Sequence, residues 1–256
     1  MLHKTFATRM LRTRQWRRPR GMLMSMRALP GRELRSSPRS SPATVTRSSA
    51  HADQQRRILR AVGELVGERG YGDVTVELIV KRAHVSFKTF YKHYPGKEEC
   101  LLALCERAYD SSEATINERL AAESGSWSEQ VVLVLTAFFE LIAAEPVLAR
   151  AVVVESPTVG PALRGLYEEA IKALVPLFRA GREFNPRGDE LPETIEETLA
   201  GSVFWSAYQR LIVGEAELLP ASLPVLLELV LRTYLRQDEA SRIARAEASD
   251  RRPALV

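Results

Sequence analysis

Apolar side chains recur along most of this 256-residue chain at spacings of three and four residues, which places them on one side of an α-helix. From Ile58 to Val66 the apolar residues share one face, and charged residues occupy the other. From Lys97 onward one such segment follows another, separated by proline and glycine, and no segment alternates as a β-strand does. We therefore expect an all-α protein. The approximate helices expected after residue 96 are 97–122, 127–144, 146–154, 159–180, 192–213 and 221–236.

The segment before Lys97 carries the end signals of three shorter helices. Asp53, Thr75 and Ser86 are residue types that favour the N-cap, and Gly70 is a typical end of the first helix. Only residues 83–85 separate the second helix from the third, which leaves room for a tight turn. This arrangement predicts a helix-turn-helix, whose second helix is free to lie in the major groove of double-stranded DNA.

The third of these helices has a polar side that suits contact with a polyanion. It offers cationic or potentially cationic groups and hydroxyls, which can donate hydrogen bonds to phosphate oxygens. These residues are Lys88, Thr89, Tyr91, Lys92 and His93. The sequence therefore predicts DNA as the partner of this helix.

The positive charge of the chain is concentrated at its start. Residues 1–50 carry 12 Lys and Arg and one acid, a net charge of +11, whereas residues 101–256 have a net charge of −9. Arginine-rich runs and Ser/Pro/Arg-rich stretches predict a disordered extension over residues 1–50, part of which a start codon assigned too far upstream would explain. The alternative is a basic arm that contacts DNA. We reject an export signal, because the apolar run from Met22 to Met26 is short and Arg27 follows it.

One run of residues is typical of a known family. From Ile79 to Glu98 it reads Ile-Val-Lys-Arg-Ala-His-Val-Ser-Phe-Lys-Thr-Phe-Tyr-Lys-His-Tyr-Pro-Gly-Lys-Glu. This resembles the DNA-binding signature of TetR-type transcriptional regulators, in which Ala-Gly-Val-Ser is followed by Gly-Thr-Leu-Tyr, His-Phe and Ser-Lys-Glu at fixed spacings. The departures are His84 and Lys88 in place of glycine, Val80 in place of alanine, and Gly96 in place of serine. His84 stands at a turn position that often needs a positive φ, so we expect strain there.

The resemblance implies which residues meet DNA. Phosphate contacts are implied for Thr75, Tyr91 and Lys97. Positions near the groove are implied for Ser86, Lys88, Thr89, Lys92 and His93.

The resemblance also implies a helical body that dimerises and binds a ligand. In TetR-type proteins the last two helices form a four-helix interface with their symmetry mates, and the alternative is that their apolar stripes serve only the internal core. The interface residues expected here are Leu199, Ser202, Val203, Leu223, Leu226, Leu227, Val230 and Tyr234. The side chains expected to line a pocket for a small, mostly apolar molecule are Tyr109, Phe138, Leu141, Tyr167, Phe178 and Trp205.

Other chemistry finds little support. The body contains no histidine, and no nucleophile–base pairing, phosphate loop or metal-ligand spacing occurs on any predicted helix, so we expect no enzymatic activity, no metal and no cofactor. Cys100 and Cys105 are five residues apart and point to different sides of one helix, which favours inert thiols in a reducing cytoplasm. The most apolar stretch, residues 131–154, contains Glu140 and Arg150 among other interruptions, so no membrane span is expected.

The expected organisation has four parts. They are a disordered basic extension (1–50), a helix-turn-helix domain (51–96), a helical ligand-binding and dimerisation domain (97–236) and a disordered tail (237–256). The expected function is a repressor that binds a palindromic operator as a homodimer and is released by a ligand. The alternatives are an activator or co-repressor-dependent regulator of the same fold, and a helical interaction module that does not bind DNA.

Overall fold

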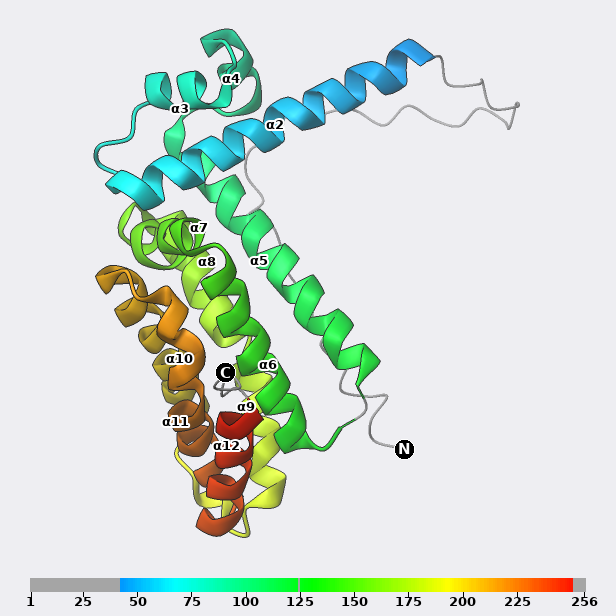
Figure 1. The fold of residues 1–256 in the computed structure, drawn as a ribbon, viewed down its shortest axis with the longest axis vertical. Coiled ribbons are helices and arrows are strands. Elements are labelled where there is room, and N and C mark those ends of the chain that lie inside the picture. Colours follow the sequence, from blue (N-terminus) through cyan, green and yellow to red (C-terminus); the bar gives the residue numbers. More distant parts are fainter. Residues whose placement is uncertain (1–41, 124, 251–256) are drawn as a thin grey trace, which may run out of the picture. The chain divides into compact units, whose positions relative to one another are not determined.

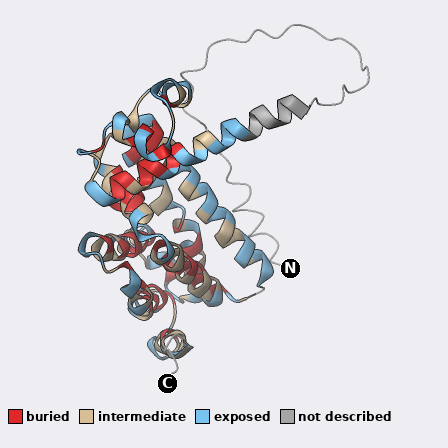
Figure 2. Ribbon diagram, turned by 45° about the horizontal axis from the view of Figure 1, so that its top comes forward, coloured by how far each residue is buried: buried red, intermediate tan, exposed pale blue. Residues whose placement is uncertain are grey.

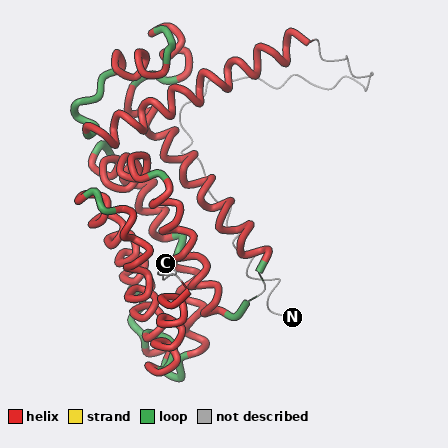
Figure 3. Tube along the Cα trace, viewed as in Figure 1, coloured by secondary structure: helices red, strands yellow, loops and turns green. Residues whose placement is uncertain are grey.

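The computed structural model describes residues 42–123 and 125–250, with side chains described for residues 50–123 and 125–248. Every regular element in these ranges is a helix, which confirms the all-α prediction (Figures 1 and 3). The α-helices are α2 (Pro42–Arg69), α3 (Val76–Ala83), α4 (Phe87–His93), α5 (Lys97–Ala122), α6 (Trp127–Ala144), α7 (Pro146–Ala149), α8 (Pro161–Lys172), α9 (Val175–Arg179), α10 (Ile195–Val213), α11 (Leu219–Arg232) and α12 (Gln237–Asp250). Shorter 3-10 and π turns are η1 (Arg150–Glu155), η2 (Ser156–Thr158), η3 (Ala180–Phe184), η4 (Gly188–Glu190) and η5 (Ala216–Leu218). The described residues from Gln54 onward belong to one compact unit, and the start of α2 before them is described by itself.

The first described helix begins earlier than the sequence indicated. Because α2 starts at Pro42, the predicted N-cap at Asp53 is wrong, and so is the prediction of disorder for residues 42–50. Proline is well tolerated in the first helical turn, and the residues from there to Asp53 include neither glycine nor a second proline. The rest of the predicted extension, residues 1–41, lies outside the described residues.

The predicted disordered tail is also partly wrong, because residues 237–250 form α12. Ala240 and Ala244 lie four residues apart and are buried, so they form a narrow apolar stripe within a charged segment. The Ser241 hydroxyl donates to the Glu228 carboxylate of α11 at 2.7 Å, which fastens α12 to its neighbour. Residues 251–256 lie outside the described part of the chain.

The body helices otherwise follow the predicted boundaries closely. The predictions 97–122 and 127–144 are confirmed by α5 and α6. Ser126 caps α6 in a capping box with Glu129, whose carboxylate accepts from the Ser126 backbone N–H at 2.6 Å. The predicted helix 159–180 is divided into α8 and α9, because Pro176 cannot donate a backbone hydrogen bond to a continuing helix.

The helix-turn-helix shares its core with neighbouring helices of the body. Figure 2 shows the buried residues of both in red. One apolar cluster takes side chains from α2 to α5 and also contains Val152 of η1 and Leu163 of α8. Helix α2 approaches α7 so closely that a Cβ at Gly67 would overlap the Val147 carbonyl. The helix-turn-helix accordingly has no apolar core separate from α5, η1 and α8, and it belongs to the same compact unit as the body.

A buried polar cluster joins α6, α9, η3, α10 and the turn that follows α11 at the other end of the body. The carboxylate of Glu196 is fully buried and accepts from the guanidinium of Arg182 at 2.6 Å and the hydroxyl of Tyr234 at 3.4 Å. The Trp127 ring packs against Tyr234, and its Nε1 donates to the Leu177 carbonyl at 2.8 Å. These interactions compensate the buried carboxylate and fix the helix ends.

Helix α6 is long and apolar enough to cross a membrane by length and composition, and among the described residues it is the one helix that is. Its most apolar side is used inside the protein, where Val131, Leu135 and Phe139 are fully buried. Core helices of globular proteins have the same composition, so we assign α6 to the core.

Candidate functional site

Helix α3 is held in place by its N-cap and by ion pairs to α2. The Thr75 hydroxyl accepts from the Leu78 backbone N–H at 3.3 Å, as the sequence predicted for an N-cap. The Arg82 guanidinium lies 3.1 Å from the Glu64 carboxylate and 3.0 Å from the Glu68 carboxylate. Its hydrogen bonds lower the pKa of Glu68.

The turn between α3 and α4 has the conformation that the sequence predicted to be strained. His84 has φ 52° and ψ 50°, the left-handed region, and is the one non-glycine residue with positive φ in the described chain. The Arg57 side chain donates to the carbonyls of Ala83 at 3.0 Å and of His84 at 3.2 Å. Arg57 thereby occupies the C-terminal carbonyls that this turn leaves without a helical partner.

Helix α4 is positioned by Ser86 and Phe90. The Ser86 hydroxyl accepts from the Thr89 backbone N–H at 3.0 Å, which confirms the predicted cap. Phe90 is fully buried, and the rings of Tyr91 and Tyr94 lie 5.4 and 6.0 Å from its ring. Burial on this side leaves the opposite side of α4 exposed.

The exposed side consists of two pairs at i and i+4, Phe87 with Tyr91 and Lys88 with Lys92, and we call these four residues the recognition face. The side chains of Phe87 and Tyr91 are 49% and 55% exposed. The face therefore presents two aromatic rings and two ammonium groups to solvent. Such a surface can offer ionic contacts to phosphates together with apolar contacts.

Two other predicted DNA-binding residues are less accessible. Thr89 and His93 are half-buried at the edge of α4. The Thr89 hydroxyl lies 2.9 Å from the Ser86 hydroxyl, so the two form a hydrogen bond with each other. Their side chains border the recognition face rather than belong to it.

Lys97 has its ammonium group engaged inside the protein. Its Nζ donates to the carbonyls of Tyr71 at 3.1 Å and Val74 at 2.8 Å, and lies 4.1 Å from the centre of the Tyr71 ring. These contacts hold the link between α2 and α3. An ammonium has three N–H donors, so one remains for another acceptor.

Phe87 is the member of the recognition face that sequence reasoning missed. Its position three residues before Phe90 is typical of a helix's apolar stripe, which would have put it in the core. The structure instead leaves the ring half-exposed in the first turn of α4. No single-sequence pattern separates these two placements.

The predicted pocket residues do not all meet. Phe138 and Tyr167 both contact the Phe204 ring, at centroid distances of 5.0 and 5.5 Å. Burial raises the pKa of the nearby Tyr109, with smaller contributions from Cys105 and Tyr167. The Tyr109 hydroxyl is buried and has no hydrogen-bond partner among the described residues.

The other predicted pocket residues lie elsewhere or are inaccessible. Trp205 is wrong as a pocket residue, because its ring is 59% exposed and stacks on Tyr208 at 5.4 Å. Phe178 is fully buried in the core, and Leu141 is half-buried on α6.

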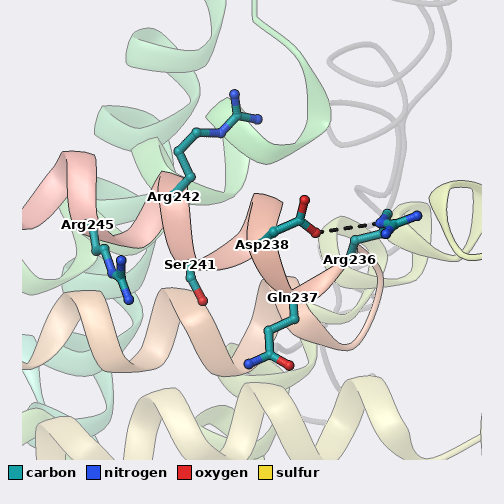
Figure 4. Close-up of a pocket in the computed structure, with 6 residues that line it drawn as sticks. All are labelled: Arg236, Gln237, Asp238, Ser241, Arg242 and Arg245. Atoms are coloured by element: carbon teal, nitrogen blue, oxygen red, sulfur yellow. Dashed lines mark ion pairs between the residues drawn. The ribbon is translucent and has the colours of Figure 1, made fainter.

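A shallow hollow on the body surface is formed by α12 and the residue before it (Figure 4). Its lining residues are Arg236, Gln237, Asp238, Ser241, Arg242 and Arg245. Arg236 and Asp238 form an exposed ion pair at 3.5 Å. None of the predicted pocket residues lines this hollow.

The predicted dimer interface is wrong in its choice of helix faces. Nearly all of its residues are buried inside the protomer, where a partner cannot reach them, and Tyr234 is bonded to Glu196. The buried residues are Leu199, Val203, Leu223, Leu226, Leu227, Val230 and Tyr234. Ser202 is half-buried, and its hydroxyl donates to the Leu199 carbonyl of its own helix at 2.7 Å.

The same two helices expose a different set of apolar residues. On α10, Trp205 and Ile212 are 59% and 39% exposed, and on α11, Val225 and Leu229 are 73% and 49% exposed. The spacings of seven and four residues keep each pair on one side of its helix. We call these four residues the apolar outer face.

Comparison with known proteins identifies the helix-turn-helix. Residues 58–104 match the family described as bacterial regulatory proteins, tetR family. The match runs from within α2 through α3 and α4 into α5, and so includes the recognition face. Residues 58–104 are a TetR-type DNA-binding domain. The resemblance noted in the run from Ile79 to Glu98 is confirmed.

One curated relative of this chain is the HTH-type transcriptional regulator EthR of Mycolicibacterium smegmatis. The two are 24% identical over 143 residues, which is 55% of this chain and 66% of the relative. The chain thus spans just under two thirds of the length of the curated relative that it matches. This relative is named as a transcriptional regulator and the family is not enzymatic, which supports the expectation that the chain is not an enzyme.

Solved structures share the TetR-type fold. The fatty acid degradation regulator FadR from Bacillus halodurans has a TM-score of 0.59 at 19% identity, covering 68% of this chain and 94% of its own. A gamma-butyrolactone receptor described as ArpA-like has a TM-score of 0.57 at 21% identity, covering 78% and 98%. FadR from Bacillus subtilis, in complex with stearoyl-CoA, has a TM-score of 0.50 at 22% identity, covering 67% and 96%.

The histidine in the turn of this TetR-type domain leads to a stability prediction. We expect His84→Gly to raise the free energy of unfolding by about 0.5–1 kcal/mol, because glycine adopts the left-handed region without the Cβ penalty but loses more chain entropy on folding. Gly214 ends α10 with φ 76° and has open space around its Cα, so Gly214→Ala is the matched reverse change. It should lower the free energy of unfolding by about 1 kcal/mol. Urea unfolding gives the free energy of unfolding of both variants and of the wild type. A His84→Gly protein less stable than the wild type would contradict the inference that His84 is strained.

Proposed function

We propose that this protein is a repressor that binds a palindromic operator as a homodimer and is released by a small, mostly apolar ligand. The observation that carries the proposal is the recognition face, which presents two ammonium groups and two aromatic rings on the helix that such domains place in the major groove. Membership of a family of bacterial regulatory proteins supports it. The proposal includes a cytoplasmic location, where the chromosome is.

The residues proposed to contact DNA fall into two groups. Lys88, Tyr91 and Lys92 are exposed and reach the groove and its phosphates directly. Four further predicted residues lie at the helix caps and edges and are proposed as neighbours of the backbone. They are Thr75, Ser86, Thr89 and His93. Lys97 is proposed mainly as a positioning residue, because its ammonium already binds two carbonyls of the α2–α3 link.

The homodimer is proposed to form through the apolar outer face. Trp205, Val225 and Leu229 are large apolar side chains on adjacent helices, and contact with a second copy would remove them from water. A symmetric dimer uses the same face of both copies and matches an operator made of inverted half-sites.

The ligand is proposed to enter the body near Tyr109, Phe138 and Tyr167. The unpaired Tyr109 hydroxyl supplies one hydrogen-bond donor beside aromatic rings, which suits an apolar molecule with a single polar acceptor. Structural relatives are named for fatty acid regulation and for gamma-butyrolactone reception. The ligand releases DNA if it binds more tightly to the conformation that does not fit the operator.

Two alternatives share this architecture. An activator or co-repressor-dependent regulator differs only in which conformation binds the operator. The other alternative, an interaction module without DNA binding, leaves the ammonium groups of Lys88 and Lys92 without a role.

The domain division at residues 96 and 97 is proposed as a division of function, with residues 54–96 reading DNA and residues 97–250 serving dimerisation and ligand binding.

The experiment that tests the proposal is selection of bound duplexes from a random DNA pool by the full chain. We expect an inverted repeat whose half-sites are about one helical turn, or a multiple of it, apart. Adding stearoyl-CoA or a gamma-butyrolactone to the bound complex then tests release by the two ligand classes. A pool that shows no enrichment over input would overturn the DNA-binding function.

A further inference from the structure

Phe87 is a large apolar side chain that the protein leaves half in water on its recognition face. Its ring is 49% exposed, whereas Phe90, three residues on, is fully buried. It lies among polar groups, with Lys88 following it and Tyr91 one turn away on the same side. Exposing a large apolar side chain is unfavourable in water, so a contact that covers this ring gains free energy.

The occupant of this face has to be a polyanion that also presents an apolar group. Lys88 and Lys92 flank the aromatic pair and provide charge complementarity to phosphate, and residues 58–104 belong to a family of regulatory proteins. Within the major groove the base edges carry hydrogen-bond donors and acceptors, and the one apolar group among them is the C5-methyl of thymine. A phenyl ring has no donor or acceptor, so it can distinguish bases there only through that methyl group.

From this we infer that Phe87 is a specificity-determining residue that reads the 5-methyl group of a thymine in each half-site of the operator. The inference rests on the proposed DNA-binding function and adds the base that this position prefers. Lys88 and Lys92 supply contacts that do not depend on sequence, while Phe87 favours thymine over cytosine by covering its methyl group. The other aromatic of the face, Tyr91, carries a hydroxyl and can bind phosphate instead.

The test replaces thymidine by deoxyuridine, which lacks only the methyl group and keeps the same pairing and acceptors. An operator obtained from the random pool is synthesised with deoxyuridine at one thymine position of both half-sites at a time, and dissociation constants are measured for the full chain. At the position read by Phe87 we expect binding to weaken about fourfold per half-site and about 15-fold for two half-sites, because one buried carbon is removed from each.

The variant Phe87→Ala should bind the thymidine and deoxyuridine operators equally. Phe184→Ala removes a phenylalanine of similar exposure from the body, 51% against 49%, and should keep the full preference for thymidine. Circular dichroism of Phe87→Ala checks that the helices remain.

The outcomes separate the inference from the function on which it rests. If wild-type protein binds every deoxyuridine operator as well as the thymidine operator, the inference is overturned and DNA binding stands. If Phe87→Ala loses affinity for both operators equally and keeps the methyl preference, the ring packs on the DNA backbone and the inference is likewise overturned. If no sequence is enriched from the pool, both the proposed function and the inference are overturned.

Discussion

Replacing Lys88 and Lys92 with alanine together is expected to weaken operator binding about 1000-fold. In the proposed dimer the two exposed ammonium groups would make four ionic interactions with phosphates, and removing each costs about 1 kcal/mol. The log–log dependence of the binding constant on salt concentration should become shallower by about 0.9 for each phosphate that the variant no longer neutralises. Fluorescence anisotropy of a labelled operator over a range of salt concentrations measures both quantities.

The control for charge alone is Lys172→Ala with Arg164→Ala, two exposed cations of α8 in the body. This variant removes the same number of charges and should keep both the affinity and the salt slope close to wild type. If Lys88→Ala/Lys92→Ala retains the wild-type salt slope, these lysines do not bind phosphate and the recognition face is misassigned.

Introducing aspartate at Val225 and Leu229 is expected to convert the proposed dimer into a monomer and to reduce operator affinity by at least about 1000-fold. Carboxylates brought together across a symmetric interface repel one another by several kcal/mol, and a monomer reads only one half-site. Because Val225 and Leu229 are 73% and 49% exposed, the protomer itself should fold as before. Analytical ultracentrifugation gives the mass, and far-UV circular dichroism checks that the helices remain.

The matched control places aspartate at Ala162 and Ala173, two exposed positions at the two ends of α8. It adds the same charge to the body and should leave the protein dimeric. A wild-type chain that sediments as a monomer, or a Val225→Asp/Leu229→Asp chain that remains a dimer, would show that the apolar outer face is not the dimer contact.

The helix-turn-helix could be predicted from the sequence because its determinants are local. Thr75 and Ser86 cap helices whose first-turn N–H groups lie three residues away, and His84 adopts the positive φ that its place in the turn required. Capping and turn geometry depend on neighbours in the sequence, so no knowledge of the remaining chain was needed.

The faces of α10 and α11 that remain exposed could not be predicted because α10 is apolar on more than two sides. The sequence indicated an interface stripe with Leu199 and Val203 on this helix. The structure buries both inside the protomer, together with Phe204, while Trp205 and Ile212 face outward. Hydrophobic periodicity gives the number of apolar sides of a helix, but it does not tell whether a side packs against its own chain or against another. The missed helix α12 has a related cause, because only Ala240 and Ala244 provide its buried apolar stripe.

The position of Gly67 against the Val147 carbonyl, together with the single cluster that joins Ile58 to Val152 and Leu163, has a consequence for how the protein melts. The DNA-reading helices have no hydrophobic core of their own, because α5, η1 and α8 contribute side chains to the same cluster. Heat or denaturant should therefore disrupt the head and the upper body in one cooperative transition. A helix-turn-helix fragment that ends at residue 96 would expose part of this shared cluster to water. The smallest cooperative folding unit that reads DNA is therefore larger than the segment that contacts DNA.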